Sequence, residues 1–185
     1  SGVNAIAHCV EALYSESRNP LVSLMAEEGI RALGRSLPMV VREPHNVDAR
    51  SEALYGAWLG GVVLGAVGMA LHHKLCHVLG GAFDLPHAET HTVLLPHVAA
   101  YNAAAAPEAM HRIASALGAP DAAQGLFDLN LAIGARVALK DIGMPESGIG
   151  HAVELATADP YYNPAPVNAE GIRQLLRNAW EGNRP

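Results

Sequence analysis

Hydrophobic residues recur every three or four positions along most of the chain, which is the periodicity of an amphipathic α-helix. In the first segment, Val3, Ile6, Val10 and Leu13 would share one face, which predicts a helix from about Val3 to Ser15. No run of alternating polar and apolar residues is long enough to predict a β-strand. The pattern therefore predicts an all-α, bundle-like domain.

Turn-forming residues divide the rest of the chain into further helices. Asn19 and Pro20 suit the start of a second helix and Pro38 suits its end. In this helix Leu21 and Leu24 are expected to face inward, together with Met25, Ile30 and Leu33. The other predicted helices begin near Val47 or span about Met69–Leu79, Pro86–Ala103 (kinked at Pro96), Pro107–Leu117, Asp121–Lys140, His151–Ala156 and Val167–Trp180.

Glycine is concentrated in the middle of the chain. The apolar run Ala57–Leu71 has 15 residues, which is shorter than the ~20 that a membrane span needs. It therefore predicts a buried core helix and no membrane partner. Glycines in this run, such as Gly60 and Gly61, lower helix stability by about 1 kcal/mol each, so they indicate close helix–helix crossings. Gly80-Gly81 predicts the end of the fourth helix.

Composition narrows the class of protein. A chain of 185 residues, half of them hydrophobic, can form one domain with a sizeable core. The net charge of −6 disfavours nucleic acid as a partner, since nucleic-acid binding requires a basic face. Cys9 and Cys76 do not suggest a disulfide scaffold, and no secretory signal opens the chain, so a cytoplasmic location is expected. The missing initiator Met and the lack of a glycine-rich phosphate loop indicate a piece of a longer enzyme.

Six of the ten histidines lie within one stretch of 27 residues in the middle of the chain. His73 and His77 are four residues apart, as are His87 and His91, so each pair shares one helix face. Together with His8 they would form a site from three helices. Three imidazoles with an oxygen donor bind Zn²⁺ or Fe²⁺ and leave an open position. Alternatively, the rings act as proton donors and acceptors, because the pKa of histidine lies near neutrality.

Other polar residues have more ordinary interpretations. Asn4 lies one turn before His8, where it would either satisfy free N–H groups at the helix start or face the same site. Lys74 is interpreted as a solvated charge and Cys9 and Cys76 as buried apolar residues. Isolated histidines are interpreted as surface or core residues: His45, His97, His111 and His151.

Two segments resemble the C-terminal helical domain of the iron-containing alcohol dehydrogenase superfamily: Asn4-Ala-Ile-Ala-His8-Cys9-Val10-Glu11-Ala12 and His73-x3-His77-x9-His87. The resemblance implies that residues 1–185 form one helical catalytic domain of the dehydroquinate synthase-like fold. It implies that an N-terminal α/β domain, absent from this chain, binds most of an NADH or NADPH cofactor. It further implies that Asn4, His8, His73 and His87 occupy the positions of the ligands to Fe²⁺ or Zn²⁺. His77 then lies beside the metal and the nicotinamide, as a catalytic and cofactor-binding residue.

Within the superfamily, the segment MALHHKLCHVLGGAFDLPHAETHTVLLPH is most similar to the maleylacetate reductases. This similarity implies a homodimer that reduces 2-maleylacetate, a small dicarboxylic keto acid, to 3-oxoadipate in aromatic compound degradation. His73, His77 and His87 are the expected catalytic residues. Asn4 departs from the Asp of metal-dependent members and binds a cation less well, because an amide carries no charge. Ala165 departs from the Arg that follows Asn-Pro in the reductases.

Two other functions stay open at this point. One is a metal-dependent alcohol dehydrogenase of the same superfamily, against which Asn4 counts. The other is a helical module that binds a metal or ligand without catalysis, against which the missing initiator Met and the missing cofactor loop count. Stoichiometric Fe or Zn would favour the dehydrogenase.

Overall fold

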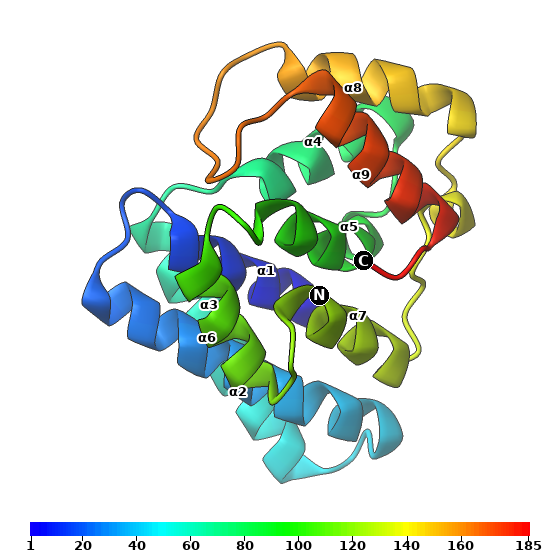
Figure 1. The fold of residues 1–185 in the computed structure, drawn as a ribbon. Helices are drawn as coiled ribbons and strands as arrows, with labels where there is room; N and C mark the ends of the chain where they lie inside the picture. Colours follow the sequence, from blue (N-terminus) through cyan, green and yellow to red (C-terminus); the bar gives the residue numbers. More distant parts are fainter.

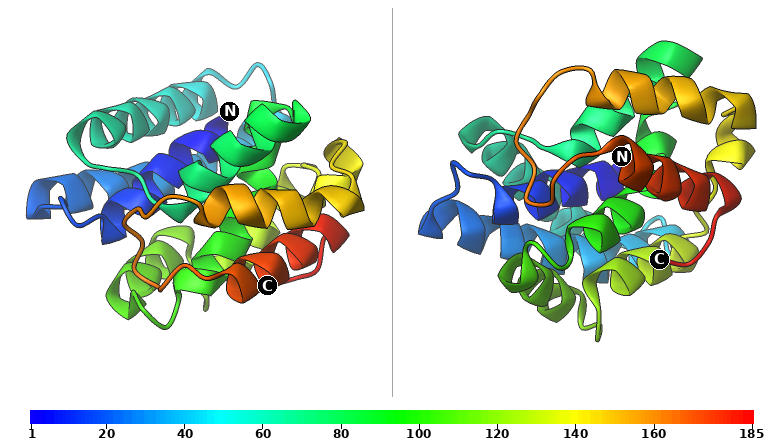
Figure 2. Two further views of the ribbon diagram at one scale, coloured as in Figure 1. Left: turned by 90° about the horizontal axis from the view of Figure 1, so that it is seen from above. Right: turned by 45° about the horizontal axis from the view of Figure 1, so that its top comes forward.

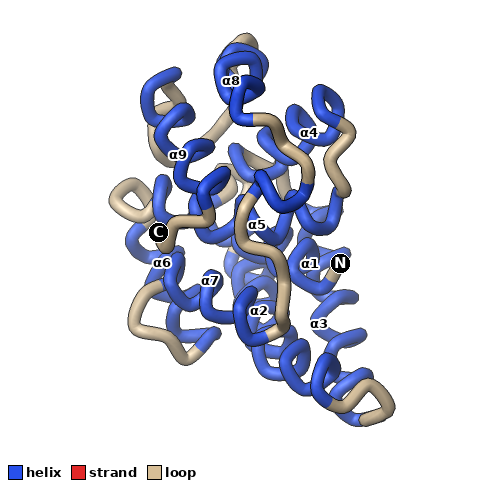
Figure 3. The backbone as a smooth tube through the Cα atoms, turned by 90° about the vertical axis from the view of Figure 1, so that its right-hand side faces the viewer, coloured by secondary structure: helices blue, strands red, loops and turns tan.

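The computed structural model describes all 185 residues and consists of helices and loops without a β-strand (Figure 3), which confirms the all-α prediction. It has nine α-helices and two short 3₁₀ helices, labelled η. The elements are α1 (Gly2–Tyr14), α2 (Pro20–Arg42), α3 (Val47–Ala66), α4 (Leu71–Phe83), α5 (His87–Asn102), α6 (Pro107–Leu117), α7 (Ala122–Ala132), η1 (Leu139–Ile142), η2 (Glu146–Gly148), α8 (Ile149–Thr157) and α9 (Ala169–Glu181).

Four helices begin at a capping residue that immediately precedes them. In each, a side-chain oxygen accepts the N–H three residues on, which satisfies a donor that has no partner within the helix. The capping residues are Asn19 of α2, Asn46 of α3, Asp121 of α7 and Asn168 of α9. The predicted start of α2 is thereby confirmed, whereas Asn4 lies inside α1, whose first residue is Gly2.

Two predicted helix ends outside the histidine segment are wrong. α2 continues past Pro38 to Arg42, because the packing of its buried side, including Ile30 and Leu33, outweighs the hydrogen bond that the proline removes. α7 ends at Ala132 rather than Lys140. Gly134 adopts the left-handed conformation (φ 67°) just beyond it, which is a common way for a helix to stop.

The fourth helix also ends later than its glycines predict. α4 continues through Gly80 and Gly81 to Phe83, and Asp84 terminates it with a left-handed backbone (φ 51°). The apolar side of α4, including Leu79, packs into the core, and that burial outweighs the weak helix propensity of two glycines. The turn between α4 and α5 is therefore made at Asp84–Pro86.

α1 runs through the middle of the domain (Figure 1) and packs against α2, α3, α5 and α6. One hydrophobic cluster joins α1 to α2, α6 and α7, and contains Ile6, Val10, Ile30 and Leu126. A second cluster joins α4, α5, α8 and α9. α5 contacts helices of both groups. The two clusters therefore meet where α1, α4 and α5 come together.

α3 lies at one edge of the bundle (Figure 2, left) and is not the buried core helix predicted for this segment. Leu54 and Trp58 are 71% and 59% exposed. On α2, Leu21 and Leu24 also face solvent, contrary to their predicted inward position. Each of these helices therefore keeps an apolar stripe outside the core, in addition to the stripe that it buries.

The predicted close crossings are confirmed for only some of the α3 glycines. A Cβ at Gly60 would lie 2.9 Å from the carbonyl oxygen of Ala5, and one at Gly56 would lie 2.7 Å from Leu33 Cγ. Gly61 and Gly65 face open space. No single helix is long and apolar enough to span a membrane. α3 and α4 taken together have the length and apolar composition of a span, but the chain bends by 96° between them.

Candidate active site

Three helices bring histidines together where the two hydrophobic clusters meet. α1 carries His8, α4 carries His73 and His77, and α5 carries His87 and His91. The ring centroids of His8 and His73 are 5.0 Å apart, and those of His73 and His91 are 4.9 Å apart. The rings of His87 and His91 are 4.3 Å apart. The predicted constellation of two histidine pairs and His8 is thus assembled in the fold.

The histidines form two layers. The inner layer consists of His72, His73 and His91, which are all buried, and each offers a ligand atom within 4.8 Å of the others. The outer layer consists of His8, which is half-buried, and of His77 and His87, which are exposed. The ring of His77 lies 6.4 Å from that of His73. His73 therefore connects the two layers.

Glu11 of α1 is fully buried behind the inner layer. One carboxylate oxygen lies 2.7 Å from Nδ1 of His73 and accepts the N–H of Ala70 at 3.0 Å. The other oxygen accepts the N–H of His72 at 2.7 Å. Burial alone would raise the pKa of Glu11, but its hydrogen bond with His73, its proximity to the rings of His72 and His73 and the N–H of Ala70 hold the pKa below its usual value. Glu11 is therefore an anion at neutral pH.

Most of the cluster is neutral at pH 7. Burial, reinforced by the proximity of His73, lowers the pKa of His8 from 6.5 to about 4. Burial also lowers the pKa of His72 to about 4 and that of His91 to about 2. The pKa of His77 is lowered as well, first by desolvation and then by His73. These rings therefore carry lone pairs that can accept a proton or bind a cation.

Several polar atoms of the cluster are buried without a hydrogen-bond partner. They include Asn4 Oδ1, His8 Nδ1 and His73 Nε2. Such atoms are destabilising unless a ligand, ion or water satisfies them. Together with His87 these residues would offer a divalent cation neutral donors only, because Glu11 uses its oxygens on N–H groups. With the other three ligands the same, an amide oxygen binds such a cation more weakly than a carboxylate does, because it carries no charge. The three rings whose ligand atoms lie within 4.8 Å of one another are those of His72, His73 and His91.

His72 and His91 are held in different ways within the inner layer. Nε2–H of His72 donates to the carbonyl oxygen of His91 at 3.0 Å, so Nδ1 of His72 carries the lone pair. Neither ring nitrogen of His91 has a partner. The spacing of the two predicted histidine pairs includes His91 but not His72, and the fold places both rings in direct contact with His73.

The remaining candidate residues lie outside the two histidine layers, although the charge of Lys74 is near enough to His77 to help lower the pKa of that ring. Lys74 is half-buried and its Nζ lies over the ring of Tyr161, 5.6 Å from the centroid, so it is not a freely solvated charge. Ala165 lies in the loop between α8 and α9, where its carbonyl oxygen accepts a hydrogen bond from Asn163 at 2.8 Å. The isolated histidines divide as predicted into the buried His97 and the exposed His45, His111 and His151. Both cysteines are buried.

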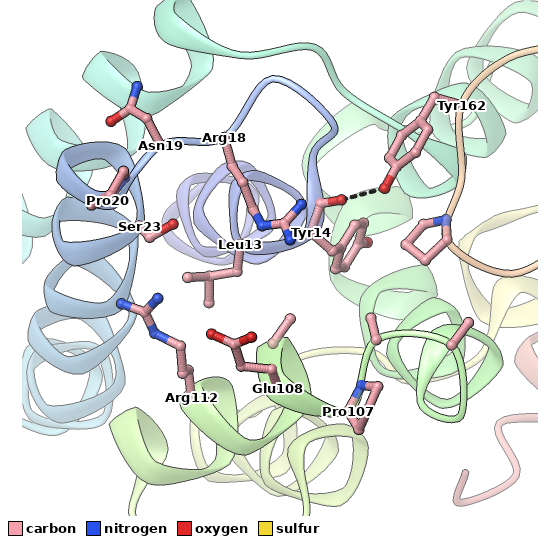
Figure 4. A pocket seen from close by; sticks show the side chains of 14 residues that line it. Leu13, Tyr14, Arg18, Asn19, Pro20, Ser23, Pro107, Glu108, Arg112 and Tyr162 are labelled. Carbon is pink, nitrogen blue, oxygen red and sulfur yellow. Dashed lines mark hydrogen bonds between the residues drawn. The ribbon is translucent and has the colours of Figure 1, made fainter.

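A cavity of about 820 Å³ lies elsewhere in the domain. It opens between the end of α1 and the first turns of α2 and α6 (Figure 4) and shares no residue with the histidine layers. Arg18 there donates to a backbone carbonyl and Arg112 is paired with Glu27. The hydroxyl of Tyr162 donates to the carbonyl oxygen of Tyr14 at 2.7 Å. Since both arginines and the Tyr162 hydroxyl already have protein partners, the cavity is a weaker candidate than the histidine cluster.

Glu11 contacts the histidine cluster, but the sequence pattern did not single it out. A signal was present, because Glu11 follows His8 by three residues and Asn4 by seven, which places all three on one face of α1. A carboxylate on the histidine face of an apolar helix indicates a buried partner for an imidazole. The segment Asn4–Ala12 contains it, but only the fold shows that its partner is His73.

Comparisons with known proteins show the family of the chain. Residues 1–180 match the model of the Fe-containing alcohol dehydrogenase family, C-terminal. The chain is 57% identical over all its 185 residues to maleylacetate reductase of Sphingobium indicum, of which it covers 53%. It superimposes over its whole length on 52% of a crystal structure of maleylacetate reductase from Agrobacterium tumefaciens, with a TM-score of 0.97 and 53% identity.

A second solved relative is the iron-containing alcohol dehydrogenase of Corynebacterium glutamicum, with a TM-score of 0.91 and 46% identity. That match covers 97% of this chain and 51% of the relative. The chain thus spans about half the length of the curated relatives that it matches. With matching sequence, fold and helix order over nearly all its residues, the chain belongs to the Fe-containing alcohol dehydrogenase family and has the all-α fold of its C-terminal domain.

Proposed function

We propose that the protein is an NAD(P)H-dependent maleylacetate reductase that acts in aromatic compound degradation. The observation that carries the proposal is identity of 48–57% to relatives named maleylacetate reductase across the whole chain. The chain contributes the helical wall of the active-site cleft. An N-terminal α/β domain supplies most of the NADH or NADPH site, and the protein works as a cytoplasmic homodimer.

The reaction needs a hydride, a proton and a place for transient negative charge. A hydride from NAD(P)H adds to the carbon–carbon double bond of 2-maleylacetate, which is conjugated to a ketone. The electron pair moves onto the ketone oxygen and forms an enolate. A proton then adds to the neighbouring carbon and the ketone of 3-oxoadipate is restored. Hydrogen-bond donors aimed at the oxyanion lower this barrier.

The outer layer and His73 are suited to these tasks. We assign His77, the most accessible member of the α4 pair, to the nicotinamide and the proton transfer. We assign His73 and His87 to the substrate oxygen, since Nε2 of His73 is free of protein partners and His87 is exposed. Nε2 of His73 donates to the oxyanion when the ring carries a proton on both nitrogens, and the Glu11 carboxylate then balances the charge of the ring. Lys74, held half-buried one position from His73, contributes positive charge near the two carboxylates of the substrate.

A metal-dependent alcohol dehydrogenase is the second candidate function. The observation in its favour is the set of unpartnered donors on Asn4, His8 and His73. With His87, these residues would hold Fe²⁺ or Zn²⁺, and such an ion would act as a Lewis acid on a substrate oxygen. The neutral charge of the donor set makes this candidate weaker than the reductase.

NADH oxidation by the full-length protein with maleylacetate, with and without a strong chelator, tests the proposal. We expect the same turnover with and without the chelator, because histidine hydrogen-bond donors take the place of a metal at the substrate oxygen. Turnover that the chelator abolishes and Fe²⁺ or Zn²⁺ restores would place a metal on Asn4 and the three histidines. No turnover with maleylacetate, together with oxidation of a simple alcohol by NAD, would replace the first candidate by the second.

A further inference from the structure

Glu11 makes an unusual set of contacts for a glutamate in a helix interior. Its side chain is fully buried, and no lysine or arginine pairs with it. Its three hydrogen-bonded neighbours all belong to the start of α4, about 60 residues further along the chain: Ala70 N–H, His72 N–H and His73 Nδ1. A buried carboxylate is strongly destabilising unless its lone pairs are satisfied. Glu11 is therefore held by α4 and, in turn, holds it.

The backbone contacts alone do not explain why a glutamate is used. α4 has no capping side chain of its own, and the negative charge of Glu11 at its first turn serves that purpose. The same chain caps α2, α3, α7 and α9 with an adjacent Asn or Asp, at far smaller desolvation cost. A local cap at position 70 would likewise satisfy an N–H of the first turn of α4, without burying a charge. What it does not provide is the third contact, with the ring of His73.

That third contact determines which nitrogen of His73 faces the site. An ionised carboxylate only accepts hydrogen bonds, so Nδ1 of His73 must carry a proton. The ring is then oriented with Nε2 on the opposite side, buried and without a protein partner. The same ring stacks on His8 at 5.0 Å, so its plane is constrained from a second side. A carboxylate behind an imidazole fixes the tautomer and orientation of the ring in this way in metal sites and catalytic triads.

We infer that Glu11 is a positioning residue that caps α4 and, through the same carboxylate, fixes His73 with Nδ1 protonated and Nε2 presented to the substrate. The inference rests on the proposed function for its catalytic consequence, but not for the state of the His73 ring. The two functions of Glu11 are coupled, because the same carboxylate binds the backbone at the start of α4 and the ring of His73.

The first test needs only the native full-length protein. Histidine ring ¹⁵N NMR, with the His73 signals assigned by their loss in His73→Gln, reports which nitrogen carries a proton. We expect a protonated Nδ1 at neutral pH. A His73 ring whose Nδ1 carries no proton would overturn the inference, whatever the enzyme turns out to reduce.

The second test replaces Glu11 by Gln, which keeps the shape but can offer an N–H to Nδ1. We expect kcat with maleylacetate to fall about 10- to 100-fold with KM little changed, as is typical for partners of ligating or catalytic histidines. The ¹⁵N spectrum should show that Nδ1 of His73 has lost its proton. Glu11→Asp, which keeps the charge but shortens the reach, should recover part of kcat.

Two variants serve as matched controls. Glu27→Gln makes the same chemical change in the Arg31–Arg112 ion-pair cluster, away from the histidines, and should retain the parental kcat. Asn168→Ala removes a local cap and should lower Tm without changing kcat. If Glu11→Gln behaves like Asn168→Ala, losing Tm but neither kcat nor the Nδ1 proton, Glu11 is only a cap and the inference is wrong. A parent without maleylacetate turnover would instead refute the proposed function, and the ring measurement would still decide the role of Glu11.

Discussion

The inner and outer histidine layers contain the same kind of side chain in opposite environments. His91 of the inner layer is fully buried, and burial lowers its pKa to about 2. His87, one turn before it on α5, is exposed. The two residues have the same side chain and lie on the same helix, so only burial distinguishes them. The exposed ring of His87 is accessible from solvent, whereas the buried ring of His91 is not. His73 belongs to both groups, because Glu11 holds it from behind and its Nε2 remains free.

The largest expected effect comes from removing a catalytic ring of the outer layer. His77→Ala should lower kcat/KM for maleylacetate by about 10²- to 10⁴-fold, the usual contribution of a positioned proton donor or acceptor. Since the His77 side chain is exposed, Tm should stay near that of the parent. Steady-state NADH oxidation and thermal unfolding measure the two quantities. A similar loss of activity in the distant surface variant His45→Ala would contradict the assignment.

Removal of a buried histidine ring from the inner layer should lower the stability of the fold rather than act directly on catalysis. His91→Ala leaves a buried cavity and should reduce the free energy of unfolding by about 2–4 kcal/mol, as for other large core side chains. His91→Leu keeps most of the volume and breaks no hydrogen bond, because neither ring nitrogen has a partner, so it should cost less than about 1.5 kcal/mol. Denaturant unfolding measures both variants. Equal losses for Ala and Leu would mean that His91 makes a polar contact.

Buried neutral histidines should also make the fold sensitive to acid. Burial lowers the pKa of His97 from 6.5 to about 4, so the unfolded chain binds more protons than the folded one between these values. The stabilisation is therefore complete above pH 6.5 and decreases as the pH falls toward 4, by about 1–3 kcal/mol for this residue. In His97→Leu, the free energy of unfolding should decrease less between pH 6.5 and 4 than in the parent. Unfolding experiments at a series of pH values measure this dependence. The exposed His45→Leu should leave it unchanged.

The smallest effect should come from adding a charge to the outer layer. Asn4→Asp places a carboxylate beside His8 and should strengthen Zn²⁺ binding on the order of tenfold or more, because ligand charge controls the affinity for cations. Isothermal titration calorimetry with the full-length protein measures the affinity. The same substitution at the surface residue Asn183 should change nothing. Unchanged Zn²⁺ affinity in Asn4→Asp would show that the Asn4 side chain does not reach a cation.

Local signals predicted several elements well. Pro107 at the start of α6 and the left-handed Gly118 after its end agree with the predicted helix, and α5 was placed within about a residue. Proline and glycine predicted helix ends wrongly at Pro38 and at Gly80-Gly81. There the packing of the whole helix outweighs the low helix propensity of one or two residues. Local signals also failed for Leu21 and Trp58, because an apolar pattern does not reveal which stripe meets a neighbouring helix.

The sequence by itself determined the all-α class, the helical spacing of the two histidine pairs and the family to which the chain belongs. These properties depend on residues close together in the chain and on motifs with fixed spacing. Only the tertiary structure decided which histidines are buried, and that Glu11 lies against His73 from 62 residues away. Burial and long-range hydrogen bonds depend on how α1, α4 and α5 pack together, and many distributed apolar contacts determine that packing.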